Sequence, residues 1–440
     1  MNDTSLYQAL KAHQQKGFAP FHTPGHKQSG FFPSDLLSLD YTELPDTDAL
    51  FEANGILHQA EEKLARLFGA RRTLISSGGC TLAIQTMLSL ACRKGRKMLL
   101  ARNSHRSAVN TCVLLGIEPI WLLPSDGGCF TGSISPDTVE QALSEHTDIA
   151  ACYLTSPTYY GELSDIGAIA AVCHRHGVYL LVDNAHGSHL AFLQDNQHPI
   201  ARGADASACS LHKTLPVLTG GAALHIGCDD FTEGTKEAMA LFGSTSPSYP
   251  IMASIDLCRE YMENNGINAY RRTEKRVTAL KQLAAAQGLP QPPGRCDPLR
   301  LAINTACAGL IGAEAQIDYC HAHGIEPEFC DGQNVVFIIT PFNTDHDFRK
   351  LHEALSGLTG HDTPIPAPPL PLPQQQLLPR EAVLSPTETV PLEDSEGRIA
   401  ADSACPCPPG IPVIVPGEVI DRSVIQRLSA IGQTTICCKQ

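Results

Sequence analysis

The chain has 440 residues, of which 43% are hydrophobic and 18% charged, so it has the composition of a folded globular protein rather than a disordered or fibrous chain. A formal net charge of −14 argues against a nucleic-acid partner, because a phosphate backbone requires a concentrated Lys and Arg surface. A single hydrophobic core stops growing at about 250–300 residues, so the length predicts two packed domains.

The first residues, MNDTSLYQALKAHQQKG, are polar and amphipathic, and the sequence holds no run of about 20 apolar residues that could span a bilayer. The 17 cysteines form an odd-numbered set without a secretion signal, which favours reduced thiols. The closest pairs, Cys405 with Cys407 and Cys437 with Cys438, lack the two-residue spacer with which thiolates share a zinc ion. We therefore expect a cytoplasmic protein with no membrane partner and no metal ion.

Short β-rich runs alternate with helical stretches from about residue 55 to 230. This alternation predicts an α/β fold, with a mostly parallel sheet covered by helices on both faces. One connection is especially clear, because Ser164 can cap a helix that stops at Gly177, just before the apolar run VYLLVDN. The strands that we expect are Arg72–Ser76, Met98–Ala101, Pro119–Leu123, Ala150–Thr155, Tyr179–Val182 and Ala222–Ile226.

The alternation weakens beyond about residue 250, where Ser254 to about Gln287 predicts a helix that leads into a smaller α+β domain. Strands are expected near Leu299–Asn304 and Val335–Ile339. The proline- and glutamine-rich stretch His361–Pro379 predicts an extended connector, and Pro406–Pro416 predicts a rigid turn followed by a short apolar strand. We divide the chain into an N-terminal arm (1–45), a large domain (46–253) and a C-terminal α+β domain (254–440) with a connector near 361–380.

The strongest chemical signal lies at the ends of two apolar runs, which finish in Asp183-Asn184-Ala185-His186 and in Ser210-Leu211-His212-Lys213. Open α/β sheets bind ligands at the carboxyl ends of their strands. Pyridoxal-5′-phosphate (PLP) requires a lysine to hold its aldehyde as an imine and an acid against its pyridine nitrogen. Taken alone, Asp183 is typical of a turn residue and Lys213 is typical of a solvated side chain. Together with their flanking residues, the two favour a PLP site.

A second signal is the run Ser77-Gly78-Gly79-Cys80-Thr81, which precedes a nearly all-apolar helix, Leu82 to about Cys92. The free N–H groups and the dipole of such a helix suit a phosphate, and glycines allow a close approach of the backbone. A tight strand-to-helix turn with a Thr81 cap explains the run equally well on local evidence. Ser210 is a second candidate phosphate donor.

Seven segments, in order, carry a resemblance that covers nearly the whole chain: PFHTPGHKQSG (20–30), RNSHRSAVNTCVLLGIEP (102–119), LTSPTYYGELSDI (154–166), LLVDNAHGSHLAF (180–192), SLHKTLPVLTGGAALH (210–225), STSPSYPIMAS (244–254) and PPGIPVIVPGE (408–418). On these segments the chain resembles the short bacterial form of the Orn/Lys/Arg decarboxylase family. The resemblance implies an aspartate-aminotransferase-like PLP fold and the decarboxylation of ornithine, lysine or arginine to a polyamine or diamine-type product and CO₂.

The resemblance also implies roles for individual residues. Lys213 would hold the cofactor, Asp183 would face the pyridine nitrogen, His105 would stack on the ring, and His212 would serve as a possible proton donor. The resemblance further implies a homodimer with the active site between subunits, in which Ser244-Thr245-Ser246 would reach the partner's phosphate. The expected cofactor-binding residues are Gly79, Cys80, Thr81, His105, Thr158, Asp183, Ala185, His186, Ser210, His212, Lys213, Ser244, Thr245 and Ser246.

Three segments depart from the family pattern: Asp48-Ala49-Leu50-Phe51, where relatives have D-x-L-H, Gly78-Gly79-Cys80-Thr81, where they have N-G-S-T, and the stretch 402–409, where they have P-Y-P-P after an acidic or amide residue. These departures bear on phosphate binding and substrate choice. Two other functions stay open from the residues, namely an aminotransferase or other lyase on the same scaffold and a catalytically weak PLP-binding homologue.

Overall fold

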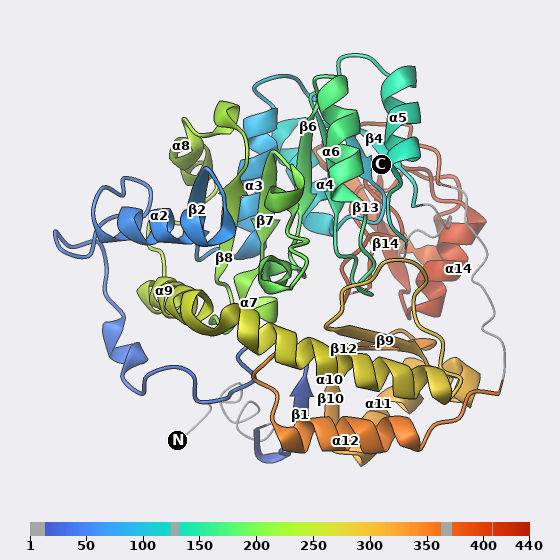
Figure 1. Cartoon of the computed structure of the whole chain (residues 1–440). Coiled ribbons are helices and arrows are strands. Elements are labelled where there is room, and N and C mark those ends of the chain that lie inside the picture. The colour runs from blue at the N-terminus through green and yellow to red at the C-terminus, as the bar shows by residue number, and fades with distance from the viewer. Residues whose placement is uncertain (1–13, 125–131, 362–371, 407) are drawn as a thin grey trace, which may run out of the picture.

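A computed structural model of the chain describes residues 14–124, 132–361, 372–406 and 408–440. Its centre is a seven-stranded sheet in which β8 runs opposite to the other six strands and pairs antiparallel with both β2 and β7, so the predicted α/β fold with a mostly parallel sheet is confirmed (Figure 1). The strands, in sheet order, are β2 (Arg72–Ser76), β8 (Ala222–Ile226), β7 (Ala206–Cys209), β6 (Tyr179–Asp183), β5 (Ala151–Thr155), β3 (Lys97–Ala101) and β4 (Glu118–Leu122).

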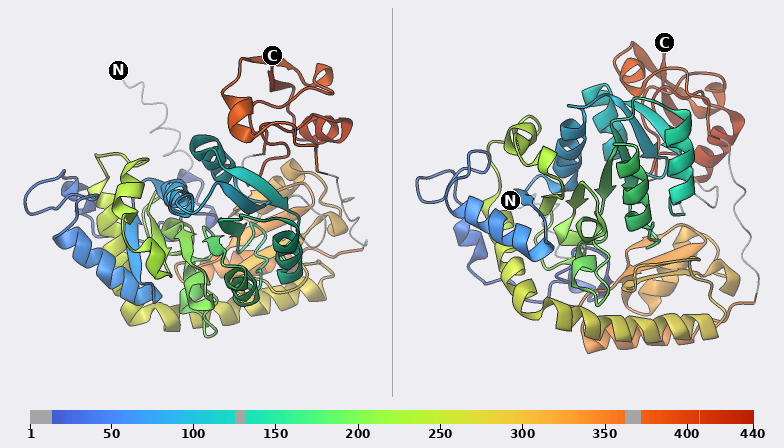
Figure 2. Two further views of the ribbon diagram at one scale, coloured as in Figure 1. Left: turned by 90° about the horizontal axis from the view of Figure 1, so that it is seen from above. Right: turned by 45° about the horizontal axis from the view of Figure 1, so that its top comes forward.

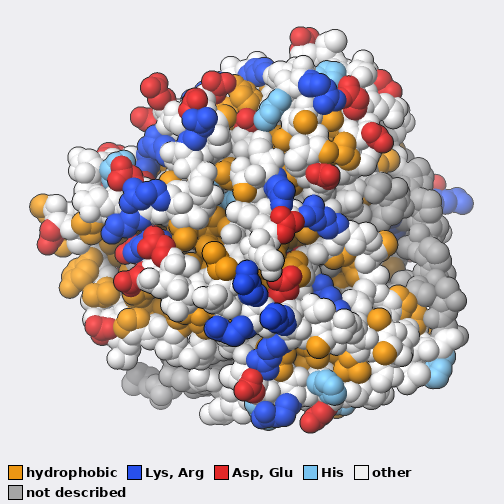
Figure 3. All heavy atoms as spheres, in the orientation of Figure 1, with side chains coloured by type: hydrophobic (Ala, Val, Ile, Leu, Met, Phe, Trp, Pro, Cys, Tyr) orange, Lys and Arg blue, Asp and Glu red, His pale blue; other side chains and the backbone are white. Residues whose placement is uncertain are grey.

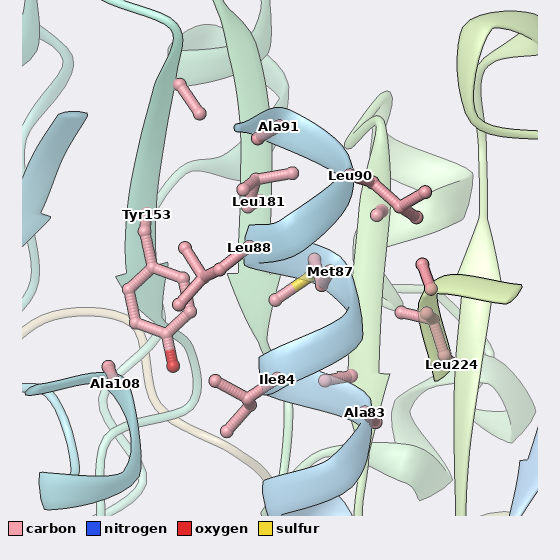
Figure 4. Packing of buried hydrophobic residues seen from close by; sticks show 14 of the residues in the cluster. Ala83, Ile84, Met87, Leu88, Leu90, Ala91, Ala108, Tyr153, Leu181 and Leu224 are labelled. Atoms are coloured by element: carbon pink, nitrogen blue, oxygen red, sulfur yellow. The ribbon is translucent and has the colours of Figure 1, made fainter. Parts of the chain in front are cut away.

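Helices bury both faces of this sheet. Alternate residues of one strand enter different cores, as when Tyr153 joins the cluster under α3 (Gly79–Ala91) while Leu154 joins the cluster under α6 (Ile166–Arg175). Figure 4 shows the first cluster, in which the apolar side of α3 packs on Tyr153 and the neighbouring strands. The remaining helices of this region are α2 (Ile56–Phe68), α4 (Arg106–Leu115), α5 (Pro136–Glu145), α7 (Leu211–Thr214), α8 (Thr235–Ala240) and α9 (Tyr249–Tyr261).

A long helix joins the large sheet to the second region. α9 passes through the π-helical turn Met262–Gly266 into α10 (Ile267–Ala286), which lies across the base of the molecule in Figure 1. The helix therefore begins before the predicted Ser254, because Pro250 in its first turn loses no helical hydrogen bond there. In Figure 3, Lys and Arg side chains gather over α10, whose sequence includes Arg271 and Arg272.

The smaller region is an antiparallel sheet with its own core. It contains β9 (Arg300–Asn304), β12 (Asn334–Ile338) and β11 (Phe329–Cys330), so both predicted strands are present. Its helices are α10, α11 (Ala313–Ala322) and α12 (Asp345–Ser356). The N-terminal strand β1 (Ala19–Phe21) pairs in parallel with β10 (Ile325–Pro327), and both strands contribute to this core.

A C-terminal module packs beside the large sheet, as the red ribbon in Figure 2 shows. It comprises α13 (Pro379–Val383), α14 (Arg422–Ala430) and the antiparallel pair of β13 (Thr387–Pro391) and β14 (Thr435–Lys439). The prediction of an apolar strand within Pro406–Pro416 is wrong, because the described residues of this stretch form no strand and Ile414 makes an isolated bridge with Ala404. Pro412 and Pro416 cannot donate to a strand ladder, which limits pairing. Residues 362–371 of the predicted connector lie outside the described residues, and so does Cys407.

The strand β7 was not predicted. Its sequence, Ala-Ser-Ala-Cys, lacks the β-branched and aromatic residues that mark strands, yet all four residues are buried between β6 and β8. Within the described ranges, no helix combines the length and the hydropathy that a membrane span requires.

Candidate active site

Asp183 and Lys213 meet at the carboxyl ends of two adjacent parallel strands. Asp183 is the last residue of β6 and pairs with Ala208 of β7, and Lys213 lies in α7, the single helical turn that follows β7. The separation of 30 residues along the chain is thereby closed by strand pairing, at the edge where open α/β sheets bind ligands. Asp183 is buried and Lys213 is partly buried.

The Asp183 carboxylate is held by neutral donors. One oxygen accepts from the Ala185 amide at 3.0 Å and the other from the Tyr153 hydroxyl at 3.2 Å. Burial raises the pKa of Asp183, although nearby Lys213 acts in the opposite direction. Among the described residues, Asp183 forms no salt bridge within 4.0 Å. A buried carboxylate without a cation is suited to hold a protonated ring nitrogen.

His186 connects Lys213 with an arginine from the smaller region. Its Nε2 lies 2.9 Å from Lys213 Nζ, and its Nδ1 lies 3.2 Å from a guanidinium nitrogen of Arg300. Because a guanidinium can only donate, Nδ1 must accept, so the proton of the neutral ring is on Nε2. Burial lowers the pKa of both His186 and Lys213, which favours a neutral imidazole that donates to a neutral amine.

His105 is fixed at the start of α4. Its Nδ1 accepts from the Ser107 amide at 3.2 Å and lies 2.8 Å from the Ser107 hydroxyl, so the ring caps the helix. The C-terminal segment closes against its other side, because a Cβ placed on Gly410 would lie 2.7 Å from His105 Nε2. Burial and the neighbouring Lys213 lower the pKa of His105 to about 4, so the ring is neutral at pH 7.

His212, the expected proton donor, is oriented by the backbone. Its Nδ1 lies 3.0 Å from the Gly221 carbonyl oxygen, and a carbonyl only accepts, so Nδ1 carries the proton. Burial lowers the pKa of His212 to about 4. At neutral pH its Nε2 is therefore a proton acceptor, and donation from this atom requires prior protonation.

The first turn of α3 provides amides for an anion. Gly79 has φ +69°, and its own N–H donates to the Gly220 carbonyl oxygen at 2.9 Å. This leaves the amides of Cys80 and Thr81, which stand in the turn where a helix cannot satisfy its own donors. Cys80 lies within hydrogen-bond reach of Ser210, the N-terminal cap residue of α7. The two candidate phosphate segments are therefore brought together.

The segment Ser244-Thr245-Ser246 is exposed and lies close to the same region of its own chain. Ser244 and Ser246 line a pocket of about 280 Å³ together with Gly78 and Thr81. No partner chain is part of this arrangement, so the intersubunit role of the segment stays a prediction.

Thr158, one of the expected cofactor-binding residues, has its hydroxyl engaged within its own loop. Its Oγ1 donates to the Glu162 carboxylate at 2.9 Å, within the loop between β5 and α6. Any contribution from Thr158 to a cofactor would therefore come from its position or its backbone.

Three residues near the site were not predicted, namely Tyr153, Arg300 and Glu328. The Glu328 carboxylate accepts from the Tyr159 hydroxyl and from the Thr23 amide, each at 2.8 Å, and its charge raises the pKa of Lys213 against the larger effect of burial. Arg300 and Glu328 come from the smaller region, so no local motif joins them to β6. Tyr153 is an inward residue of β5 and looks in sequence like ordinary core.

Two family models match the chain. The model described as Orn/Lys/Arg decarboxylase, major domain, matches residues 4–292, and that of the C-terminal domain matches residues 370–435. Among curated proteins, an arginine decarboxylase of Bacillus subtilis is 30% identical over 97% of this chain and 93% of its own length.

Solved structures agree on the fold. A lysine decarboxylase of Francisella novicida superimposes with a TM-score of 0.78 at 20% identity, covering 93% of this chain and 76% of its own. A structure of SPT with PLP gives a TM-score of 0.60 at 15% identity, covering 77% of this chain and 87% of its own. These likenesses confirm the aspartate-aminotransferase-like fold that was expected.

Proposed function

Because the chain belongs to the Orn/Lys/Arg decarboxylase family, we propose that it is a PLP-dependent enzyme that decarboxylates a basic amino acid to an amine and CO₂. The observation that carries this proposal is the pair formed by Asp183 and Lys213. A buried carboxylate without a cation and a lysine amine with a lowered pKa stand at the ends of neighbouring strands. Both groups are required by PLP and are otherwise costly to bury.

The surrounding residues fit each part of the cofactor. Lys213 would bind its aldehyde, Asp183 would hold the proton on its pyridine nitrogen, and His105 would face the ring. The amides of Cys80 and Thr81 with the Ser210 hydroxyl suit its phosphate. When bound, PLP supplies an electron-accepting ring that stabilises the electron pair left on the substrate Cα as CO₂ departs.

The protein's own groups would manage the protons. In the net reaction the Cα–carboxylate bond breaks and a proton takes the place of CO₂ on Cα. Lys213 faces the N–H of His186 Nε2 at 2.9 Å as a neutral amine, so it can deliver that proton only after it has taken one up, for example from the α-ammonium group of the substrate. His212 Nε2 can accept a proton first and return it later, since its Nδ1 is committed to Gly221.

The charge around the site favours a cationic substrate. The Glu328 carboxylate acts on Lys213, His212 and Lys27, and the chain as a whole is acidic. Arginine is the first substrate to test, because the relative with 30% identity is an arginine decarboxylase. Purified protein with PLP should be assayed against arginine, lysine and ornithine, with alanine as an uncharged control, reading amine and 2-oxo acid products. Formation of a 2-oxo acid without CO₂ would instead support an aminotransferase.

We also propose that the enzyme works as a homodimer in which Ser244-Thr245-Ser246 supports the partner's phosphate site. The variant with all three residues changed to alanine should bind PLP more weakly, by about 0.5–1.5 kcal/mol per hydrogen bond lost and by more for bonds to a charged phosphate. In mixed dimers with Lys213→Ala, the intact Lys213 would receive its hydroxyl segment from the other chain, so activity should return at limiting PLP. No recovery, despite demonstrated subunit exchange, would mean that the segment serves its own chain, where it lines a pocket with Thr81, or serves no phosphate site.

A further inference from the structure

Three side chains that bind metal ions well meet in the core beside the candidate active site. His198 precedes the 3₁₀ turn Pro199–Arg202, Cys209 is the last residue of β7, and His225 lies on β8. All three are fully buried, with 0% of their surface exposed. One donor atom from each residue lies within 4.8 Å of the others.

The hydrogen bonds of this cluster leave two ring nitrogens unexplained. His198 Nε2 lies 3.3 Å from Cys209 Sγ, and His225 Nδ1 lies 2.9 Å from the Thr73 hydroxyl. His198 Nδ1 and His225 Nε2 are buried and have no partner. These contacts satisfy two of the four ring nitrogens, and buried polar atoms without partners are rare in folded proteins. An ion bound by His198 Nε2, Cys209 Sγ and His225 Nε2 would engage the third nitrogen, His225 Nε2, and would leave only His198 Nδ1 without a partner.

The contacts of His225 are those of a metal ligand. Histidines that bind a metal through one nitrogen usually donate their other N–H to a neighbouring oxygen, which fixes the ring. Thr73 supplies that oxygen for His225 Nδ1, which leaves the lone pair of Nε2 free to bind an ion. The 3.3 Å between His198 Nε2 and Cys209 Sγ is close to the roughly 3.5 Å expected between nitrogen and sulfur ligands of one tetrahedral zinc ion.

We propose that His198, Cys209 and His225 bind a zinc ion that ties β7 and β8 to the 3₁₀ turn at Pro199. The Asn184 carboxamide is the candidate for the fourth position. Its Nδ2 lies 3.4 Å from Cys209 Sγ and its Oδ1 has no partner, so a reversed amide would point its oxygen at the ion.

Zinc is the ion that this ligand set fits best, because mixed nitrogen and sulfur ligands in a closed, buried site are typical of structural zinc. Such an ion would stiffen β7, which leads to Ser210, and β8, and through Asn184 it would also fix the end of β6 at Asp183, without touching the substrate. The ligands are 11 and 16 residues apart along the chain (209 − 198 and 225 − 209), so sequence spacing did not reveal them. The expectation of no metal ion rested on cysteine pairs that are close in the sequence.

X-ray absorption at the zinc edge tests the site in the unmodified holoenzyme. Protein expressed with added zinc and then dialysed against a chelator should retain about one zinc per chain, because the site has no access to solvent. The spectrum should show one sulfur at about 2.3 Å and the remaining nitrogen or oxygen ligands at about 2.0–2.1 Å. Absence of retained zinc, or a shell with no sulfur or with several, would overturn the proposal.

Variants test which residues hold the ion. Cys209→Ser and His225→Asn should each lower the retained zinc at least about tenfold. The control Cys258→Ser changes a buried cysteine on α9, outside the cluster, and should keep the zinc. Equal zinc in all four proteins would show that the ion sits elsewhere and would refute the assignment. If Cys209→Ser does not fold, the wild-type absorption spectrum decides alone. Because metal content is read without turnover, this result is independent of the decarboxylase proposal.

Discussion

The Nε2 atom of His186 lies 2.9 Å from the Nζ atom of Lys213. Arg300 donates to the opposite nitrogen of the same ring, so the proton of the neutral imidazole must face the lysine. A protonated Lys213 would then place two donors against each other. Arg300, which comes from the smaller region, thereby favours the neutral amine that reacts with an aldehyde.

The variant Arg300→Met should make Lys213 a poorer nucleophile at neutral pH. Removing the guanidinium frees His186 to accept from an ammonium group and removes a charge that lowers the pKa of Lys213, although burial remains the largest effect. We expect PLP uptake by cofactor-free protein at pH 7 to slow about tenfold, with the midpoint of its pH profile at higher pH. Absorbance of the bound cofactor measures both.

Two further variants distinguish the effect of Arg300 on the position of the His186 proton from the effect of its positive charge. Arg300→Lys keeps the charge but loses the fork that serves both His186 and the Tyr159 carbonyl, so it should also slow PLP uptake. Arg295→Met removes an exposed arginine paired with Asp195 and should leave uptake unchanged. A pH profile for Arg300→Met that coincides with that of the wild type would contradict this role.

Asp183→Asn should fold normally and lose about two to three orders of magnitude in kcat, because a neutral amide cannot hold a protonated ring nitrogen. Tyr153→Phe is the matched control, since it removes one hydrogen bond to the same carboxylate at 3.2 Å and keeps the charge. We expect a loss of about tenfold or less for that variant. Steady-state kinetics decide between them, and comparable losses in both would remove the special role of the charge.

Gly410→Ala should impair the site through His105. A Cβ added at Gly410 would lie 2.7 Å from His105 Nε2. The φ of Gly410 is +74°, a backbone conformation that is strained for any residue with a side chain. Gly397→Ala controls for strain, because its φ is +80° but no atom lies within 4 Å of its Cβ. Both variants should lose about 1–2 kcal/mol of stability, and only Gly410→Ala should lose cofactor affinity. Equal affinity in the two would show that the C-terminal segment does not position His105.

The buried pair of Asp297 and His189, 2.9 Å apart, should make stability pH-dependent. Burial alone would raise the pKa of Asp297, but the charge and hydrogen bond of His189 lower it to about 2. A lowered pKa stabilises the fold above the unfolded value near 4, and this contribution of about 2 kcal/mol is lost as the pH falls towards 2. Denaturant unfolding should therefore show a difference between wild type and Asp297→Asn that is full at pH 6 and shrinks below about pH 4. A difference in the free energy of unfolding that stays the same at every pH would show that the Asp297–His189 pair does not cause the pH dependence.

Much of the large sheet followed from the sequence, because its apolar runs are short, separated by helices and bounded by clear stops such as Gly177. The sequence also placed Asp183 at the end of a strand and Lys213 after an apolar run, and the pairing of β6 with β7 brings the two together. β7 itself was missed because small residues at a buried strand carry no β-forming pattern. Its burial depends on neighbours that are distant in the chain.

The contacts around the site were less predictable than the site itself. Arg300 reaches His186 over 114 residues of sequence, and Gly410 reaches His105 from the C-terminal module. Such contacts depend on how the regions pack, which local patterns do not encode. Which ring nitrogen of each histidine carries the proton likewise depends on the atoms that the ring contacts, as the Gly221 carbonyl shows for His212.

The central claim is that the chain replaces the carboxylate of a basic amino acid with a proton from solvent, using Lys213. The most direct measurement is mass spectrometry of the product formed from arginine and PLP in D₂O, with Lys213→Ala in parallel. The wild type should give the decarboxylated amine with one carbon-bound deuterium per molecule and an equal amount of CO₂, and the variant should give neither. A 2-oxo acid in place of the amine, no decarboxylated product from arginine, lysine or ornithine measured in the same way, or equal product from Lys213→Ala would contradict the account.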